Sequence, residues 1–371
     1  MLSAITVSHP PLIARSGRDL RAHDTEVAAI AAVSRLDSMA QGHPLSALGR
    51  MLVRLESVAS SKIEHLDASA TDYARALSGS RANDSATAMV AASTAIVALI
   101  ESVGPGGRLP VRAILDAHDA LMQDDPFESR HRGAFRTMQN WIGGSDHSPR
   151  DALYVPPPPA EVANLIDDLL AFVHRDDLPP LTQAAIAHAQ FESIHPFTDG
   201  NGRIGRALIQ VVLRRRGVAR DVVVPVASAL AADREDYFDR LTRYRDGDAG
   251  PIVEGIADAA RIAAEACLDL PGVLSALPVE WRAEARPRRG SAADALIDRL
   301  PAEPVVSASS IEAALGVSYT AANGAIAALR EAGILSPLDE RRRDRAFVAH
   351  EVLDELTRLE TEIRQRAAAR S

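Results

Sequence analysis

The stretch SIHPFTDGNGRIGR, residues 193–206, restricts what this chain can fold into more than any other segment. Helical spacing of apolar residues precedes it and resumes near Arg203, so the glycine-rich part is a loop between two helices. The backbone N–H groups of Gly200, Asn201 and Gly202 then gather at the start of the second helix, where helix ends bind anions. The segment therefore predicts a phosphate-binding loop.

The side chains around this loop supply the rest of a phosphate-handling site. Arg203 and Arg206 are three residues apart, so they lie on one side of the second helix and offer fixed positive charge. Asp199 precedes the loop, where a carboxylate can hold a Mg²⁺ ion that bridges phosphate oxygens. His195 titrates near neutral pH and can take a proton from a hydroxyl nucleophile. The only lysine is Lys62, which excludes a Walker-type phosphate loop.

Two other kinds of site share part of this pattern and fit it less well. The glycines of GNGRIG (200–205) match a dinucleotide-binding fingerprint, but that motif needs an apolar strand directly before it. A helical pattern and HPFTD stand there instead. A calcium loop beginning at Asp199 would place Arg203 at a ligand position and Ile204 where the turn requires glycine.

The composition limits the class of protein. A length of 371 residues predicts two or three domains. The formal net charge of −9 argues against a surface built as a whole for nucleic acid or an anionic membrane. No apolar run approaches the roughly 20 residues that span a bilayer, and the N-terminus lacks a signal-peptide pattern, so we expect a cytoplasmic protein without membrane contact. The single cysteine, Cys267, cannot form an internal disulfide.

The chain divides into four segments by pattern. Residues 1–107 are a helical, alanine-rich N-terminal region that GPGG closes. Residues 108–270 form a core around the loop, and within them RTMQNWIG and ALYV are short strand candidates that predict a hairpin. Residues 271–290, rich in proline and arginine, predict a linker. Residues 291–371 show two short helices separated by Gly316 and then a basic segment, the pattern of a winged helix-turn-helix domain.

The partner of that last domain stays open between DNA and protein. Arginines in the linker and near the wing favour phosphate contact: Arg286, Arg288, Arg289, Arg341, Arg342, Arg343 and Arg345. Against DNA, the second of the two helices offers few basic side chains. Its candidate base readers are Tyr319, Thr320 and Asn323.

The segment HPFTDGNGRIGR resembles the signature of Fic domain proteins and matches it at every fixed position. The resemblance extends to FRTMQNWIGG and ALYVPPPP, which are similar to the family's flap, and to SVASSKIEH, so it covers roughly residues 20–270. It implies an all-α core with a short β-hairpin flap. It also implies transfer of AMP from the substrate ATP to a protein hydroxyl, with Mg²⁺ as the cofactor.

The same resemblance assigns roles to individual residues. His195 would be the general base, Phe197 a buried anchor and Asp199 the Mg²⁺ ligand. The residues expected to hold the phosphates are Gly200, Asn201, Gly202, Arg203 and, for the γ-phosphate, Arg206. The flap residues expected to pair with an extended segment of the target are Trp141, Ile142, Gly143 and Gly144.

The segment SSKIEH allows two interpretations. As a helix start, Ser60 or Ser61 would cap the helix and Glu64 would lie favourably in its first turn. The resemblance to Fic proteins implies instead an inhibitory helix, in which Ser60 and Glu64 match the family's pattern and Glu64 pairs with Arg206. His65 departs from the glycine or asparagine of that pattern.

These inferences predict a protein adenylyltransferase that moves AMP to a Tyr, Ser or Thr hydroxyl of a target or of itself and that Glu64 inhibits. Three alternatives stay open: a DNA-binding regulator whose core acts as a sensor, transfer from another nucleotide, and removal of AMP. The sequence leaves the target protein undefined and is compatible with a homodimer.

Overall fold

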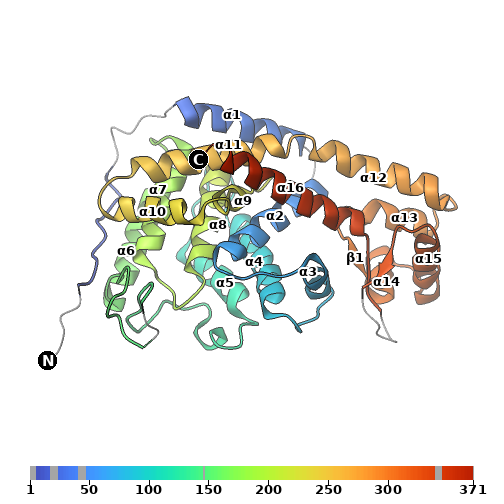
Figure 1. Cartoon of the computed structure of the whole chain (residues 1–371), viewed down its shortest axis with the longest axis horizontal. Coiled ribbons are helices and arrows are strands. Elements are labelled where there is room, and N and C mark those ends of the chain that lie inside the picture. Colours follow the sequence, from blue (N-terminus) through green and yellow to red (C-terminus); the bar gives the residue numbers. More distant parts are fainter. Residues whose placement is uncertain (1–5, 17–23, 41–46, 145–146, 339–344, 371) are drawn as a thin grey trace.

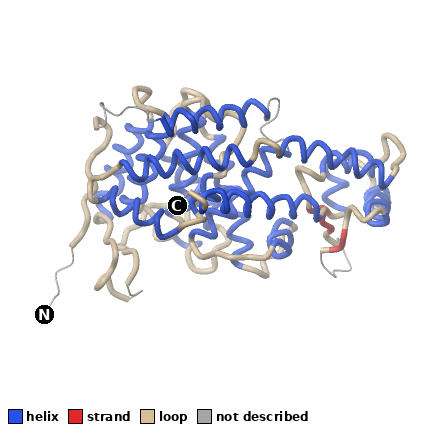
Figure 2. Tube along the Cα trace, turned by 45° about the horizontal axis from the view of Figure 1, so that its top comes forward, coloured by secondary structure: helices blue, strands red, loops and turns tan. Residues whose placement is uncertain are grey.

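The computed structural model describes residues 6–16, 24–40, 47–144, 147–338 and 345–370. This part of the chain is mostly helical, as expected (Figures 1 and 2). The helices are α1 (Asp24–Met39), α2 (Ala47–Ile63), α3 (Ala70–Leu77), α4 (Asp84–Glu101), α5 (Val111–Met122), α6 (Pro159–Val173), α7 (Pro180–Ile194), α8 (Asn201–Arg215), α9 (Val226–Leu230), α10 (Arg234–Arg245), α11 (Gly250–Ala266), α12 (Leu270–Ala285), α13 (Ala292–Arg299), α14 (Ala308–Leu315), α15 (Tyr319–Glu331) and α16 (His350–Ala368). A 3-10 turn covers Ser129–His131, and the strands are β1 (Val305–Val306), β2 (Ser336–Pro337) and β3 (Phe347–Val348).

Helices α7 and α8 form the centre of the fold. Every residue of α7 from Leu181 to Ile194 is buried, which requires packing on all sides, and α6, α8, α10 and α11 supply it. Helix α8 packs in addition on α2, α4 and α5. The apolar side chains of these helices belong to one continuous core cluster. The loop between α7 and α8 is therefore held on a rigid base.

Prolines and polar side chains fix where several helices begin. Pro159 and Pro180 occupy the first positions of α6 and α7, where a helix does not need the missing N–H. Ser69 and Asn83 cap α3 and α4, each accepting a hydrogen bond from a backbone N–H of the first turn. The prolines at 156–159 and 179–180 therefore mark helix boundaries.

The predicted hairpin is reduced to a single antiparallel bridge. Ile142 N donates to Tyr154 O at 2.8 Å, and Tyr154 N donates to Ile142 O at 3.2 Å. Gly143 and Gly144 follow with φ values of 74° and 75°, left-handed conformations that take the chain out of the strand. RTMQNWIG and ALYV therefore pair only at this bridge within the described residues.

The predicted linker at 271–290 is mostly helix, so that prediction was wrong. Helix α12 covers most of it and packs on α2, α13 and α15. Its buried residues recur at helical spacing: Leu270, Leu274, Leu277 and Trp281. The proline content was misleading, because one proline lies in the first turn, where helices tolerate it, and the helix continues through Pro278.

The C-terminal segment combines a small helical unit with a long returning helix. Strands β1, β3 and β2 form an antiparallel sheet in that order, beside α13, α14 and α15 at one end of the molecule (Figures 1 and 2). Helix α16 then runs back over the core and packs on α2, α9 and α11 (Figure 1). Arg341, Arg342 and Arg343 of the predicted wing lie outside the described residues.

Two helical stretches are long and apolar enough to cross a membrane by length and hydropathy, Asp84–Glu101 and Gly250–Ala285. Of their apolar windows, 50% and 44% are buried inside the fold. Core helices of water-soluble proteins pass the same test of length and hydropathy, so the finding is weak evidence for a membrane span.

Candidate active site

His195 ends α7 in a left-handed conformation. Its φ is 49° and its ψ is 61°, and its N–H donates to Phe191 O at 2.9 Å. Arg136, itself buried, donates from Nε to the His195 carbonyl at 2.8 Å. This conformation costs a residue with a Cβ roughly 1–2 kcal/mol, so the surrounding contacts must hold it. The chain thus turns sharply at the residue predicted to be the base.

The imidazole of His195 is neutral at physiological pH. Burial, together with the charges of Arg245 and Arg136, lowers its pKa to about 4, against a raising effect of Glu64. Its Nδ1 is buried and has no hydrogen-bond partner among the described residues. A neutral ring is the form that can accept a proton from a substrate hydroxyl.

Phe197 and Asn201 hold the loop in shape. Phe197 is fully buried, and its ring stacks on His118 with the ring centroids 3.7 Å apart. Asn201 Oδ1 accepts from Phe197 N at 2.8 Å, and Asn201 Nδ2 donates to Phe197 O at 2.9 Å. Because the Asn201 side chain is engaged in this way, its backbone N–H is the group left for a phosphate. His118 Nδ1 accepts from Gly133 N at 3.1 Å and its Nε2 is hydrogen-bonded to Asp199 O at 3.2 Å, so His118 has a structural part in holding the loop.

Two glycines allow close approach at the start of α8. Gly200 precedes the helix with a φ of 77°, and a Cβ there would lie 2.5 Å from Met122 Cε. A Cβ on Gly202 would lie 1.9 Å from Glu64 Oε1. The carboxylate of Glu64 therefore lies against the first turn of α8, where the unpaired N–H groups of a helix start favour a negative charge.

Arg206 is buried and bonded to the end of α2. Its Nε donates to Ser60 Oγ at 2.9 Å, and its Nη2 donates to Ser60 O at 2.8 Å and to Glu64 Oε1 at 2.7 Å. Burial works to raise the pKa of Glu64, but the charge and hydrogen bond of Arg206, with smaller effects of Arg203 and His195, hold it below its usual value. The Glu64 carboxylate is therefore ionised at neutral pH.

Asp199 and Arg203 form an ion pair at the open side of the loop. Arg203 Nη2 lies 3.2 Å from Asp199 Oδ2, and the Asp199 side chain is 54% exposed. Among the described residues no group of three or more His, Cys, Asp and Glu side chains could hold a metal ion. Mg²⁺ commonly takes one or two carboxylates together with substrate phosphates. A single exposed carboxylate next to a phosphate loop fits that mode of binding.

The segment SSKIEH is the end of α2, so its interpretation as a helix start was wrong. Helix α2 ends at Ile63, after which Leu66 N donates to Ser61 O and His65 N donates to Lys62 O, both at 3.1 Å. This pair of bonds defines a Schellman motif, whose left-handed position is normally glycine or asparagine. His65 occupies that position with a φ of 62°. The histidine therefore keeps the helix-end geometry, with backbone strain.

Comparison with known proteins identifies a domain in the chain. Residues 108–213 match the family model described as Fic/DOC family. The chain carries a Fic/DOC domain. Two curated proteins, both named protein adenylyltransferase Fic, are 34% identical (Drosophila willistoni) and 32% identical (Drosophila melanogaster) over 154 residues. The matches cover 40% of this chain and 27% and 28% of those relatives, so the chain spans little more than a quarter of their length.

Solved structures with Fic domains share the fold. A Fic family protein from Desulfovibrio desulfuricans has a TM-score of 0.55 at 21% identity, covering 89% of this chain and 97% of its own. A Fic domain containing signaling protein from Bacteroides thetaiotaomicron has a TM-score of 0.53 at 16% identity, covering 66% and 98%. At these identities the likeness concerns the fold alone.

The segment predicted to be the flap lies beside the loop at 193–206. Asn140 Nδ2 donates to Phe197 O at 2.9 Å, and Tyr154 Oη donates to Ser193 O at 2.6 Å. Both chain segments that meet at the Ile142–Tyr154 bridge are thus hydrogen-bonded to residues of the 193–206 stretch. The flap residues and the loop residues predicted from the sequence are brought together.

Three further residues surround Arg206, and their part in the site was missed in the sequence. Tyr237 Oη accepts from Arg206 Nη1 at 3.4 Å and is hydrogen-bonded to His188 Nε2 at 2.8 Å. Glu192 is buried, which raises its pKa to about 7. Burial also lowers the pKa of His188 to about 3. His188 and Glu192 are four residues apart on α7, but no sequence spacing connects them with Tyr237, because only folding brings α10 against α7.

Proposed function

We propose that the chain is a protein adenylyltransferase, which moves AMP from ATP to a hydroxyl group of a protein and releases pyrophosphate. The observation that carries the proposal is the placement of a neutral His195 and the first turn of α8 at the two ends of one short loop. The name of the relatives that match the Fic domain supports the same reaction.

Each side chain of the site has a place in this reaction. The N–H groups of the first turn of α8, with Arg203, would hold the α- and β-phosphates, and Arg206 would take the γ-phosphate. His195 would take the proton of the attacking hydroxyl on a ring nitrogen. Asp199 would hold Mg²⁺, which when bound neutralises phosphate charge. Catalysis would thus rest on positioning and charge stabilisation.

We also infer that Glu64 inhibits the enzyme. The carboxylate lies against the start of α8 and occupies Arg206, the side chain proposed for the γ-phosphate. ATP would then bind without its γ-phosphate partner and would be poorly placed for in-line attack. The flap, including Trp141 and Ile142, would receive an extended segment of the target by strand addition.

The test is self-modification of the full chain with ATP labelled at the α-phosphate. His195→Ala should lose transfer while its ATP affinity, measured by calorimetry, stays within about twofold, because the loop and Arg203 are untouched. His350→Ala, the same change at an exposed histidine of α16, should transfer as the wild type does. Label transfer from a second sample of ATP labelled only at the γ-phosphate, or transfer at the wild-type rate by His195→Ala, would contradict the proposal.

We propose in addition that the unit containing α13, α14 and α15 is a winged-helix module. Its element order, with β1 after α13 and the sheet order β1-β3-β2, supports this proposal. DNA binding by this unit stays a prediction. Anisotropy of a labelled DNA duplex with the full chain tests it, because phosphate contacts weaken steeply between low and moderate salt.

A further inference from the structure

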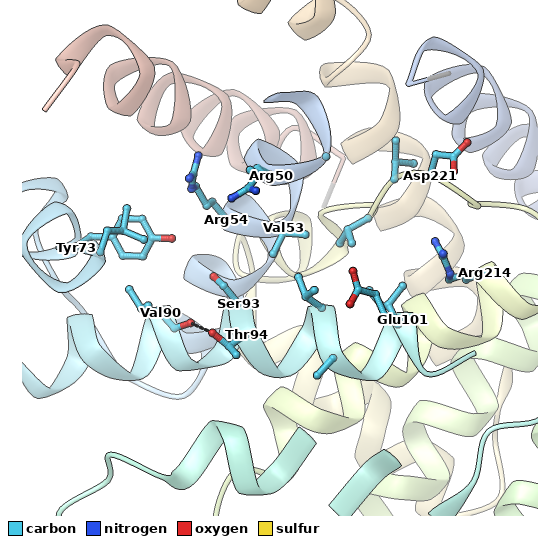
Figure 3. A pocket seen from close by; sticks show the side chains of 17 residues that line it. Arg50, Val53, Arg54, Tyr73, Val90, Ser93, Thr94, Glu101, Arg214 and Asp221 are labelled. Atoms are coloured by element: carbon cyan, nitrogen blue, oxygen red, sulfur yellow. Dashed lines mark hydrogen bonds between the residues drawn. The ribbon is translucent and has the colours of Figure 1, made fainter. Parts of the chain in front are cut away.

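A groove with a volume of about 570 Å³ lies between α2, α3 and α4 and reaches the end of α8 (Figure 3). Its walls are mainly apolar and include Val53, Leu77, Val90, Val97 and Val223. The volume falls in the range of small-molecule sites, roughly 300–1,000 Å³. None of its lining residues belongs to the loop at 193–206, so the groove is separate from the candidate active site.

One end of the groove carries buried polar atoms that form no hydrogen bond of normal geometry with the described residues. Arg54 is 9% exposed, and while its Nη2 donates to Ala302 O at 2.7 Å, its Nη1 has no hydrogen bond to any described residue. Tyr73 Oη, also buried, makes no hydrogen bond of normal geometry within the described chain. Burial raises the pKa of Tyr73, and the charge of Arg54 together with hydrogen-bond contacts to Ser93 and Ser57, which fall outside normal geometry, offsets this only in part. Unpaired buried polar atoms cost about 1–3 kcal/mol each, which favours a partner from outside.

The charges at this end favour an anion as that partner. Arg50 and Arg54 both line the groove there, and the carboxylate of Glu303 lies 3.6 Å from Arg50 Nη2. Glu303 also pairs with Arg299 at 3.1 Å, so among the described residues its single charge is shared between arginines. The acidic lining residues lie at the opposite end of the groove, beside Arg214 (Figure 3): Glu101 and Asp221. Water could pair with Arg54, but it would leave the valine-lined walls exposed to solvent.

We propose that this groove binds a small molecule that has an apolar body and one anionic group. The anion meets Arg54 Nη1 and the Tyr73 hydroxyl, and the body covers Val53 on α2 and Val90 and Val97 on α4. This site stands independently of the proposed AMP transfer. Its α2 wall belongs to the same helix whose far end contacts Arg206.

Two fluorescent probes test the proposal on the full chain. 8-Anilinonaphthalene-1-sulfonate and N-phenyl-1-naphthylamine share an apolar body, and only the first carries an anion. The sulfonate should bind saturably at one site. Arg54→Met, which keeps the length of the side chain and removes its charge, should weaken sulfonate binding about tenfold, the size of one charge-assisted hydrogen bond. It should leave binding of the amine within about twofold. Val97→Trp, which fills the groove from α4, should remove binding of both probes.

Urea unfolding of each variant shows whether the fold is kept. If Arg54→Met unfolds the protein, Tyr73→Phe takes its place, because it removes only the hydroxyl and should weaken the sulfonate but not the amine. If Arg54→Met or Tyr73→Phe weakened binding of both probes equally, the anionic group would play no part in binding, and the proposal would be overturned. Unchanged sulfonate binding in Val97→Trp would place the probe elsewhere and overturn it too.

Discussion

Glu64→Gln removes the charge from the contact with Arg206 and keeps the size of the side chain. In the native structure Arg206 Nη2 donates to Glu64 Oε1 at 2.7 Å, with the side chains 1% and 34% exposed. A hydrogen bond to a charged group contributes about 1.5–3 kcal/mol. The exposure of Glu64 places this contact near the lower value, because solvent screens it. A contribution of about 1.4 kcal/mol corresponds to a factor of ten. We therefore expect the variant to self-modify about tenfold faster at low ATP.

The assay combines the rate of self-modification with ATP affinity from calorimetry at saturating Mg²⁺. Glu360→Gln is the matched control, since it makes the same change to the 2.6 Å Lys62–Glu360 ion pair at the same end of α2 without touching Arg206. This control should alter both quantities by less than about twofold. Combining Glu64→Gln with Arg206→Ala should lose the gain, because the released arginine is missing.

Equal rates and affinities in wild type and Glu64→Gln would refute the idea that Glu64 competes with the γ-phosphate for Arg206. A similar gain in the self-modification rate of Glu360→Gln would also refute this idea. It would show that a looser α2, rather than a free Arg206, controls the site.

Three further predictions follow from the site. Arg245→Met should raise the pKa of His195 above about 4, because the Arg245 charge is one cause of the lowered value. The neutral base is lost as the pH falls through this pKa, so the acidic limb of the pH profile of the transfer rate should move to higher pH. An acidic limb at the same pH as in the wild type would contradict this prediction. Asp199→Asn should raise the Mg²⁺ concentration for half-maximal transfer by roughly tenfold or more, and an unchanged titration would place the metal elsewhere. His65→Gly should raise the free energy of unfolding in urea by about 1 kcal/mol by relieving the left-handed backbone, whereas His65→Ala, which keeps the strain, should not.

The loop at 193–206 could be predicted because the residues proposed for its chemistry are contiguous in the sequence. His195, Asp199 and the two arginines fall within fourteen positions, and the helical patterns on either side place them. The contact of Glu64 with Arg206 joins residues 142 positions apart. It was reached only through resemblance to a family, because the residues alone favoured a helix start at SSKIEH.

Tyr237 and Glu192 show what the sequence could not indicate. Their environments depend on α10 packing against α7, and no periodicity in either helix specifies which helix will cover the other. A buried carboxylate such as Glu192, whose pKa rises to about 7 through burial, looks in the sequence like any polar residue on a helix. Tertiary packing therefore decides the electrostatics around Arg206.

Helix α16 connects the C-terminal segment to the surroundings of Arg206. The domain boundary predicted at residue 290 would have separated the two. Leu359 and Ile363 are fully buried against the core, and Glu360 of the same helix holds Lys62 at 2.6 Å. The end of α2 is thus fixed by α16 and by the Schellman motif at His65. Because the backbone is held from both directions, rotation of the Glu64 side chain is a smaller change than movement of the helix. For this reason we expect Glu64→Gln to free Arg206 while α2 stays in place.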